Sequence, residues 1–316
     1  MKVYISTDPF SKTSTEPEKL LRYNGFDVRK NNFGRKITSN ELAREIQDAD
    51  ILIAGTEKIT EEVFLNAPNL KLISRVGIGL DGIDFALCEK YNIRVAYTPD
   101  APTVAVAELC VGLILDMARK ITVTNNNMKT HQLWRRHMGM LLNNKTVGII
   151  GLGRIGKTLV HLLSSFNVKF LVYDLEPDYA FVKINRIQLA SKAEVLKYSD
   201  VISLNIPLDE HTEGYISAPE LELVKSDVMI VNTARGGIID EGGLYEFLKE
   251  NPEAQAAIDV FEQEPYQGPL LSLENCLLTC HMGASTQDSR TDMEIGAVDA
   301  AIKFSQQLPI KNEVLF

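Results

Sequence analysis

The stretch VGIIGLGRIGKTL, residues 147–159, places three glycines between an apolar run and an amphipathic run. Gly151, Gly153 and Gly156 fit the pattern G-x-G-x-x-G, which is weak by itself because glycines also serve turns and close packing. Here a strand pattern precedes the glycines and a helix pattern follows them. That context is typical of a phosphate-binding turn, in which backbone N–H groups face a pyrophosphate.

A second strand pattern, VKFLVYD at residues 168–174, ends in Asp174, 18 residues after Gly156. A carboxylate at this place suits the hydroxyls of an adenosine ribose and repels a 2′-phosphate. The neighbouring Leu175 and Glu176 offer no cation to offset that repulsion. The sequence therefore predicts a dinucleotide-binding domain that takes NAD rather than NADP.

Apolar strand patterns alternate with amphipathic helix patterns on both sides of this motif, which favours parallel sheets covered by helices. One series of strands lies before Pro99, and a second runs from residue 146 to residue 280. A long apolar helix begins near Pro102, and one more amphipathic helix follows Ser285 and should dock on one of the domains. A length of 316 residues suits two domains, so we predict two α/β domains.

Composition excludes several classes of function. The formal charge of −9 disfavours nucleic acid and anionic membranes as partners, and the N-terminus reads as a strand rather than a signal peptide. Cys276, Cys280 and His281 lack the spacing of zinc or haem motifs, so we predict no metal and two inward cysteines on one strand. We expect a reduced, cytoplasmic protein.

Polar side chains follow three consecutive strand patterns of the second series. Arg235 ends the strand in VNTARGG, Glu264 follows the strand AAIDVF, and His281 ends the strand CLLTC. Burying the charge of Arg235 requires either a structural carboxylate or an anionic ligand. Because ligands of doubly wound sheets lie at the carboxyl ends of strands, we expect these side chains at one edge. A cation, a carboxylate and a histidine after a dinucleotide motif favour hydride transfer to a keto acid over a surface cluster.

Four motifs in order, GLGRIG, NTARGGIIDEGGL, AAIDVFEQEP and CHMGAST, resemble the D-isomer-specific 2-hydroxyacid dehydrogenase family, most closely its phosphoglycerate dehydrogenase-like branch. The likeness runs from about residue 50 to residue 300. It implies an α/β fold of two doubly wound domains, a Rossmann cofactor domain inserted into a flavodoxin-like substrate domain. Residues 1–98 and 286–316 would form the discontinuous substrate-binding domain, and residues 99–285 the NAD-binding domain.

The resemblance also assigns roles to single residues. Arg235 would anchor the substrate carboxylate and carbonyl, His281 would be the acid/base, and Glu264 would hold its imidazole. The cofactor-binding positions carried over are Gly151, Gly153, Arg154, Ile155, Gly156, Asp174, Pro207, Thr233, Ala234, Asp259 and Gly283. The stretch SRVGIGLDGID would present backbone donors to the substrate carboxylate, with Arg75, Gly77, Ile78 and Gly79 as substrate-binding residues. For Arg75 a structural ion pair is an equal alternative.

We therefore predict an NAD-dependent homodimeric enzyme that interconverts a small 2-keto acid and its D-2-hydroxy acid. Trp134 stands where family members lend a loop across the dimer, and packing is its favoured role. One alternative is 3-phosphoglycerate dehydrogenase of serine biosynthesis. It is disfavoured because Ala54 stands where such enzymes carry an arginine, and because ending at Phe316 leaves no room for their regulatory domains.

Two further alternatives fit the same motifs. An NADH-sensing regulatory protein on the same scaffold would keep the three polar residues, but the charge of −9 and the lack of a tail disfavour it. Formate dehydrogenases, a nearer branch, carry glutamine where Glu264 stands.

Overall fold

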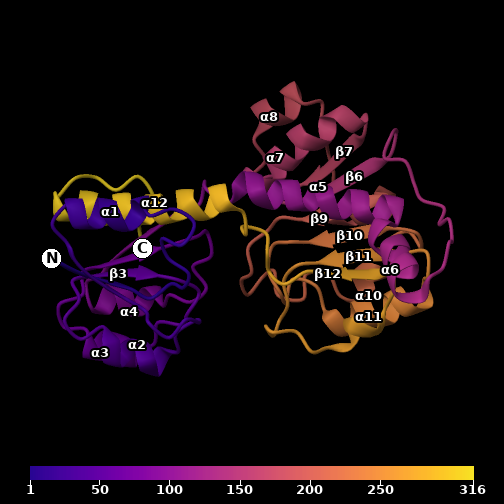
Figure 1. The fold of residues 1–316 in the computed structure, drawn as a ribbon. Coiled ribbons are helices and arrows are strands. Elements are labelled where there is room, and N and C mark those ends of the chain that lie inside the picture. Colours follow the sequence, from indigo (N-terminus) through magenta and orange to yellow (C-terminus); the bar gives the residue numbers. More distant parts are fainter. The chain divides into compact units, whose positions relative to one another are not determined.

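The computed structural model describes residues 1–316, and the chain divides into two compact units. Unit 1 comprises Met1–Thr103 with Ala284–Phe316, and unit 2 comprises Val104–Gly283. The expected boundaries, after residue 98 and after residue 285, lie a few residues from these. Each unit holds one sheet with helices on both of its faces (Figure 1). Among the helices none combines the length and the apolar character needed to cross a membrane.

The unit 1 sheet has the strand order β13-β5-β4-β3-β1-β2. Strands β1 to β5 are parallel to one another, and β13 is antiparallel to β5. The five parallel strands have the spatial order 2-1-3-4-5, which is flavodoxin-like. The strand order reverses between β1 and β3. The strands are β1 Lys2–Ile5, β2 Asp27–Lys30, β3 Ile51–Ala54, β4 Leu72–Arg75, β5 Arg94–Tyr97 and β13 Glu313–Val314.

Helices from both ends of the chain cover one face of this sheet. In Figure 1, α1 (Glu16–Tyr23) and α12 (Gln287–Ser305) lie together on that face, and they share one core cluster with Leu21 and Met293. The opposite face carries α2 (Ser39–Glu45), α3 (Glu61–Asn66) and α4 (Phe85–Lys90), which contribute to a second cluster. The predicted helix after Ser285 is therefore α12, and it packs within unit 1.

The unit 2 sheet has the order β12-β11-β10-β9-β6-β7-β8, and all its strands are parallel. When the strands are numbered from β6 onward, their spatial order is 3-2-1-4-5-6-7. This is the Rossmann order, 3-2-1-4-5-6, with a seventh strand at one edge, and the order reverses between β6 and β9. The predicted fold class is confirmed. The strands are β6 Thr146–Ile150, β7 Lys169–Tyr173, β8 Gln188–Leu189, β9 Val201–Leu204, β10 Met229–Asn232, β11 Gln255–Ile258 and β12 Cys276–Leu278.

Two apolar clusters cover the faces of the unit 2 sheet. One joins the sheet to α5 (Thr103–Arg119) and α7 (Arg154–Leu163), which begins directly after the glycine turn and continues into the short η1 (Ser164–Phe166). The other joins it to α9 (Lys192–Tyr198), α10 (Ala218–Leu221) and α11 (Glu241–Glu250), with η2 (Pro269–Ser272) contributing Leu270. A short helix, α8 (Tyr179–Ile184), follows β7. Because both faces are covered, the strands read as unbroken apolar runs.

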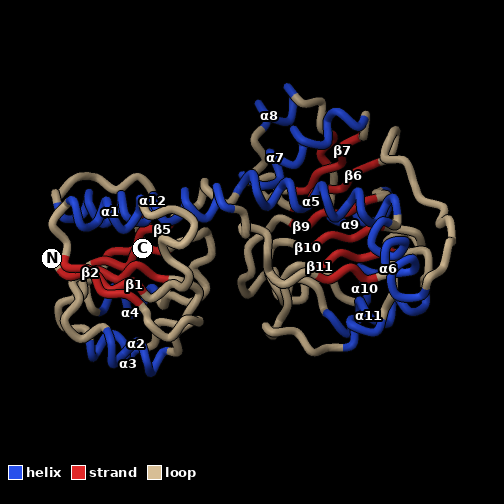
Figure 2. The backbone as a smooth tube through the Cα atoms, in the orientation of Figure 1, coloured by secondary structure: helices blue, strands red, loops and turns tan.

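Several elements differ from the sequence-based expectation. Lys120, in a left-handed conformation, ends the long helix and separates α5 from α6 (Ile121–His131), which buries no residue. A long loop then leads to β6 (Figure 2). The prediction of two inward cysteines is wrong: Cys276 is buried in β12, whereas the strand ends at Leu278 and Cys280 is exposed.

Candidate active site

The three glycines of the turn after β6 have three different steric roles. Gly151 has a φ of +94°, and a Cβ there would lie 2.6 Å from the carbonyl oxygen of Asn205. A Cβ on Gly156 would lie 2.3 Å from the carbonyl oxygen of Gly151, so α7 packs tightly on the strand end. A Cβ on Gly153 would meet nothing within 4 Å. The turn therefore offers open space at the N-terminus of α7, where a pyrophosphate could approach backbone N–H groups.

Asp174 lies beside this turn, at the end of β7. Its Oδ2 accepts a hydrogen bond from the N–H of Leu152 at 2.5 Å, and its Oδ1 accepts one from the N–H of Glu176 at 2.8 Å. These two bonds fix the carboxylate next to the glycine turn. A ribose whose pyrophosphate lies on the turn would be within reach of such a carboxylate.

Asn205 is a candidate site residue that the sequence did not reveal. It follows β9 at the point where the strand order reverses, and its Nδ2 donates to the carbonyl oxygen and the Oγ of Ser203 at 3.3 and 3.1 Å. Its Oδ1 is buried and has no hydrogen-bond partner. An unsatisfied buried acceptor costs about 1–3 kcal/mol, so this atom suits a donor from a bound ligand. Together with the open turn and the fixed carboxylate, it makes unit 2 fit a dinucleotide.

His281 and Glu264 form a direct pair at the carboxyl ends of neighbouring strands. The Nδ1 of His281 lies 2.9 Å from each carboxylate oxygen of Glu264. Because an ionised carboxylate only accepts hydrogen bonds, Nδ1 donates its proton and Nε2 is the atom that can exchange a proton with a ligand. The side chains are 46% and 39% exposed, so a small molecule can reach them.

Asp259 holds the turn that carries His281. It is 1% exposed; its Oδ1 accepts from Thr279 Oγ1 (2.6 Å) and the N–H of Met282 (2.8 Å), and its Oδ2 from the N–H of Gly283 (2.9 Å). Its carbonyl oxygen accepts from the N–H of His281 at 2.7 Å. His281 has a φ of +53°, a conformation that costs about 1–3 kcal/mol unless its surroundings enforce it. Asp259 supplies that enforcement.

Arg235 follows β10, the strand beside β11. Asn232 organises the turn, because its Nδ2 donates to the carbonyl oxygen of Arg235 at 2.9 Å and its Oδ1 accepts from the N–H of Ala234 at 3.1 Å. A Cβ on Gly236 would lie 2.0 Å from the carbonyl carbon of Phe261. Only glycine lets this turn pack against the segment that leads to Glu264, so the structure brings Arg235, Glu264 and His281 to one edge of one sheet.

The remaining cofactor candidates lie at the same edge. Thr233 is buried, and its Oγ1 lies 3.0 Å from the Sγ of Cys110. Burial raises the pKa of the Cys110 thiol to about 11, so this thiol stays protonated at neutral pH. The other positions are the first turn of α7 with Arg154 and Ile155, the loop after β9 with Pro207, and the two strand-end segments with Ala234 and Gly283.

The predicted substrate loop belongs to unit 1 and follows β4. Arg75 is 9% exposed, its Nη1 donates to the carbonyl oxygen of Val76, and its guanidinium lies against Gly77, whose φ is +135°. The N–H of Gly77 donates to Thr98 Oγ1 at 2.7 Å, so it is already engaged within the unit. The half-buried Ile78 and Gly79 follow it. The assignment of these four residues to substrate binding stays a prediction.

Residues 111–283 match the family model described as D-isomer specific 2-hydroxyacid dehydrogenase, NAD binding domain. The chain belongs to this family. A D-3-phosphoglycerate dehydrogenase of Methanocaldococcus jannaschii is 40% identical over 80% of the chain and 49% of the relative. A hydroxypyruvate reductase of Thermotoga maritima is 34% identical over 96% of the chain and 97% of the relative. The crystal structure of a phosphoglycerate oxidoreductase of Vibrio cholerae superimposes with a TM-score of 0.83 at 32% identity, covering 97% of the chain and 99% of that structure.

The matched relatives differ in length. The chain spans about half the length of the D-3-phosphoglycerate dehydrogenases of Methanocaldococcus jannaschii and Bacillus subtilis, but nearly all of the hydroxypyruvate reductase and 99% of a solved 3-phosphoglycerate dehydrogenase of Entamoeba histolytica. The family fixes the cofactor as NAD and the class of fold.

Proposed function

We propose that this chain is an NAD-dependent oxidoreductase that interconverts a small 2-keto acid and its D-2-hydroxy acid. The observation that carries the proposal is the His281–Glu264 pair, which lies at the same sheet edge as Arg235 and the glycine turn of the cofactor domain. This edge offers an acid/base, a group that orients it, a cation and a dinucleotide site, which together meet the needs of keto-acid reduction.

Each of the three polar residues takes part in this reaction. Bound NADH supplies the hydride. His281 gives the proton on Nε2 to the carbonyl oxygen of the keto acid, and in the reverse direction it takes that proton back. Glu264 accepts the hydrogen bond from Nδ1, which fixes the orientation of the ring and leaves Nε2 for the substrate. Arg235 binds the substrate carboxylate through its planar fork and polarises the carbonyl.

The preference for NADH is the first expected result. Asp174 would accept hydrogen bonds from the ribose hydroxyls, and the same carboxylate would repel the 2′-phosphate of NADPH. We expect kcat/KM to be at least tenfold higher with NADH, about 1.4 kcal/mol. Steady-state rates with both cofactors at one keto-acid concentration measure this ratio. Equal use of the two cofactors would remove Asp174 from the cofactor site.

The second expected result concerns the phosphorylation state of the substrate. Ala54 is the last residue of β3, is 1% exposed and belongs to a core cluster, so this position offers no cation to a phosphate. We expect hydroxypyruvate or glyoxylate to be reduced at least as efficiently as 3-phosphohydroxypyruvate. A panel of 2-keto acids with NADH, followed at the nicotinamide absorbance, tests both this order and the proposed activity. A strong preference for the phosphorylated acid would favour the alternative, a 3-phosphoglycerate dehydrogenase.

A regulatory protein that senses NADH is the alternative from another class. It would use the same cofactor turn and could keep all three polar residues. The same panel separates the two, because a sensor binds NADH without consuming it whatever keto acid is supplied. The exposed, solvent-accessible His281–Glu264 pair favours turnover.

We also propose that two copies of the chain form a dimer through α6 and the loop that follows it. Large apolar side chains are exposed along this segment, among them Ile121 at 55%, Leu133 at 52%, Trp134 at 81% and Met138 at 90%. Exposed apolar patches of this kind favour a protein partner, and oligomers of identical subunits are the commonest. Trp134 is the single tryptophan. We expect light scattering to give twice the mass of the monomer. Dilution should separate the copies and shift the tryptophan emission to longer wavelength. A monomer at micromolar concentration would contradict the proposal.

We place the protein in the reducing cytoplasm. Its four cysteines are free thiols, and Cys280 is exposed next to His281. Thiols persist in this form where glutathione and thioredoxin keep them reduced.

A further inference from the structure

Thr279, the residue that follows β12, carries a hydroxyl to which the proposed chemistry gives no task. Its Oγ1 donates a hydrogen bond to Oδ1 of Asp259 at 2.6 Å, and its N–H donates to the carbonyl oxygen of Ile258 at 3.0 Å. An O–H donor this close to a carboxylate oxygen forms a charge-assisted bond, which is about twice as strong as a neutral one. The hydroxyl therefore joins the end of β12 to the end of β11 within unit 2.

This hydroxyl is one of three donors that hold the buried carboxylate of Asp259. Oδ1 also accepts from the N–H of Met282 at 2.8 Å, and Oδ2 accepts from the N–H of Gly283 at 2.9 Å. A buried carboxylate must be satisfied by donors, because burial removes the water that would otherwise solvate it. Loss of the hydroxyl would therefore leave Oδ1 short of a donor and weaken the hold of Asp259 on the two backbone N–H groups.

The same aspartate fixes the chain on both sides of His281. Thr279 precedes the histidine by two residues, and Met282 and Gly283 follow it directly. The N–H of His281 itself donates to the carbonyl oxygen of Asp259 at 2.7 Å. Its φ is +53°, a strained conformation for a residue other than glycine, and such a conformation persists only where the surroundings enforce it. The bonds to Asp259 are what enforce it.

The two sides of this turn are held in different ways. A Cβ on Gly283 would lie 3.2 Å from Cγ2 of Val106 in α5, so the C-terminal side is held by packing as well as by Asp259. The N-terminal side depends on the bonds of Thr279. The turn in its present shape places Nδ1 of His281 2.9 Å from each carboxylate oxygen of Glu264. A displacement of about 1 Å in such a geometry can lower a rate about a hundredfold.

We propose that Thr279 is a positioning residue for the acid/base. Through Asp259 it holds the backbone of His281 in the shape that sets the ring against Glu264, and so it fixes where Nε2 lies. This role rests on the proposed function, because it concerns the proton that His281 exchanges with the substrate. In this role Thr279 touches neither substrate nor cofactor.

The test begins with Thr279→Val, in which a methyl group replaces the hydroxyl. We expect kcat for keto-acid reduction to fall about tenfold, because the ring is no longer held in one place. The KM for the keto acid should stay within about twofold of wild type, because Arg235, which is assigned to the substrate carboxylate, follows a different strand. Thr279→Ser keeps the hydroxyl and should restore kcat to within about twofold of wild type.

A double variant separates positioning from a general structural role. If Thr279 acts through His281 alone, Thr279→Val should change kcat by less than about twofold in the His281→Ala background. A further tenfold loss in that background, about 1.4 kcal/mol, would show that Thr279 acts on something other than the acid/base and would overturn the role.

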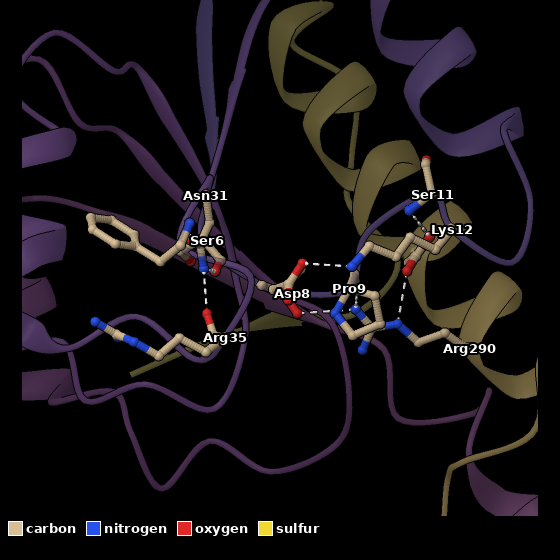
Figure 3. Close-up of polar contacts among 11 residues, drawn as sticks. Ser6, Asp8, Pro9, Ser11, Lys12, Asn31, Arg35 and Arg290 are labelled. Atoms are coloured by element: carbon tan, nitrogen blue, oxygen red, sulfur yellow. Dashed lines mark hydrogen bonds and ion pairs between the residues drawn. The ribbon is translucent and has the colours of Figure 1, made fainter.

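Thr38→Val is the matched control, because Thr38 makes a hydroxyl–carboxylate bond of the same kind in unit 1. Its Oγ1 donates to Oε2 of Glu41 at 2.8 Å and caps α2. Figure 3 shows the segment before this cap, where Nδ2 of Asn31 donates to the carbonyl oxygen of Arg35 at 2.8 Å, so the segment stays anchored without Thr38. The variant should melt at a lower temperature, since it loses a helix cap, and should keep the wild-type kcat. An equal loss of kcat in both threonine variants would contradict the role of Thr279.

The tautomer of His281 is measured in parallel, by long-range proton–nitrogen NMR spectra, so that one readout does not depend on turnover. The chain has five histidines, and the signals of His281 are identified by their absence from His281→Ala. In wild type the neutral ring should carry its proton on Nδ1, as the bond to Glu264 requires. In Thr279→Val part of the population should shift to the tautomer with the proton on Nε2.

The outcomes separate this role from the proposed activity. A tautomer shift in Thr279→Val, with no consumption of NADH by wild type, would overturn the proposed activity and support the role of Thr279. A wild-type kcat with an unchanged tautomer would overturn the role of Thr279 and leave the activity standing. If melting curves show that Thr279→Val does not fold, Thr279→Ala, in which water can reach Oδ1 of Asp259, is measured in the same way.

Discussion

Replacing His281 with alanine is expected to lower kcat for keto-acid reduction about a thousandfold, within the range that a positioned acid/base contributes. The variant loses the Nε2 proton donor, and no other group in the assigned site takes its place. We expect the dissociation constant of NADH, measured by its fluorescence, to stay within about twofold of wild type, because the residues assigned to the cofactor are unchanged. His161→Ala, on the exposed side of α7, is the matched control and should keep full activity.

Glu264→Gln separates the orienting group from the acid itself. The amide keeps the shape of the pair but replaces one of the two accepting oxygens with an NH₂ group, so it holds Nδ1–H less firmly. For Glu264→Gln we expect a loss in kcat smaller than that of His281→Ala.

Wild-type rates in His281→Ala would show that solvent or another residue delivers the proton, and the mechanism would need a different acid.

Arg235→Lys is expected to lower kcat/KM about a thousandfold, with both a higher KM and a lower kcat. Lysine keeps the positive charge but lacks the planar fork that binds a carboxylate through two parallel hydrogen bonds. If Arg235 also polarises the carbonyl, part of its interaction is made only in the transition state, so kcat must fall as well. Arg44→Lys, on the exposed surface of α2, should have no effect. A higher KM with an unchanged kcat would limit Arg235 to binding the carboxylate.

Much of the fold could be predicted from local sequence because parallel strands buried on both faces are unbroken apolar runs. Both expected series of strands, one before Pro99 and one between residues 146 and 280, are present in the structure. The two-residue strands β8 and β13 were missed, because Gln188–Leu189 and Glu313–Val314 are too short to carry a period. Helix α6 was missed because ITVTNNNMKTH has no apolar stripe and buries nothing.

The candidate site, like the fold, could be predicted only in part from the sequence. The glycine turn and Asp174 are recognisable because their spacing reflects one local unit, a strand, a turn and a helix. Asn205 was missed because a single asparagine after a strand becomes informative only when its Oδ1 is found buried without a partner.

The most direct test of the central claim is the identity and configuration of the product. Wild-type protein is incubated with hydroxypyruvate and NADH, the absorbance of NADH is followed, and the glycerate formed is resolved by chiral chromatography. The account predicts one molecule of D-glycerate for each NADH consumed, and D-glycerate formation about a thousandfold slower with His281→Ala. Formation of L-glycerate, or no consumption of NADH with any 2-keto acid of the panel, would contradict it.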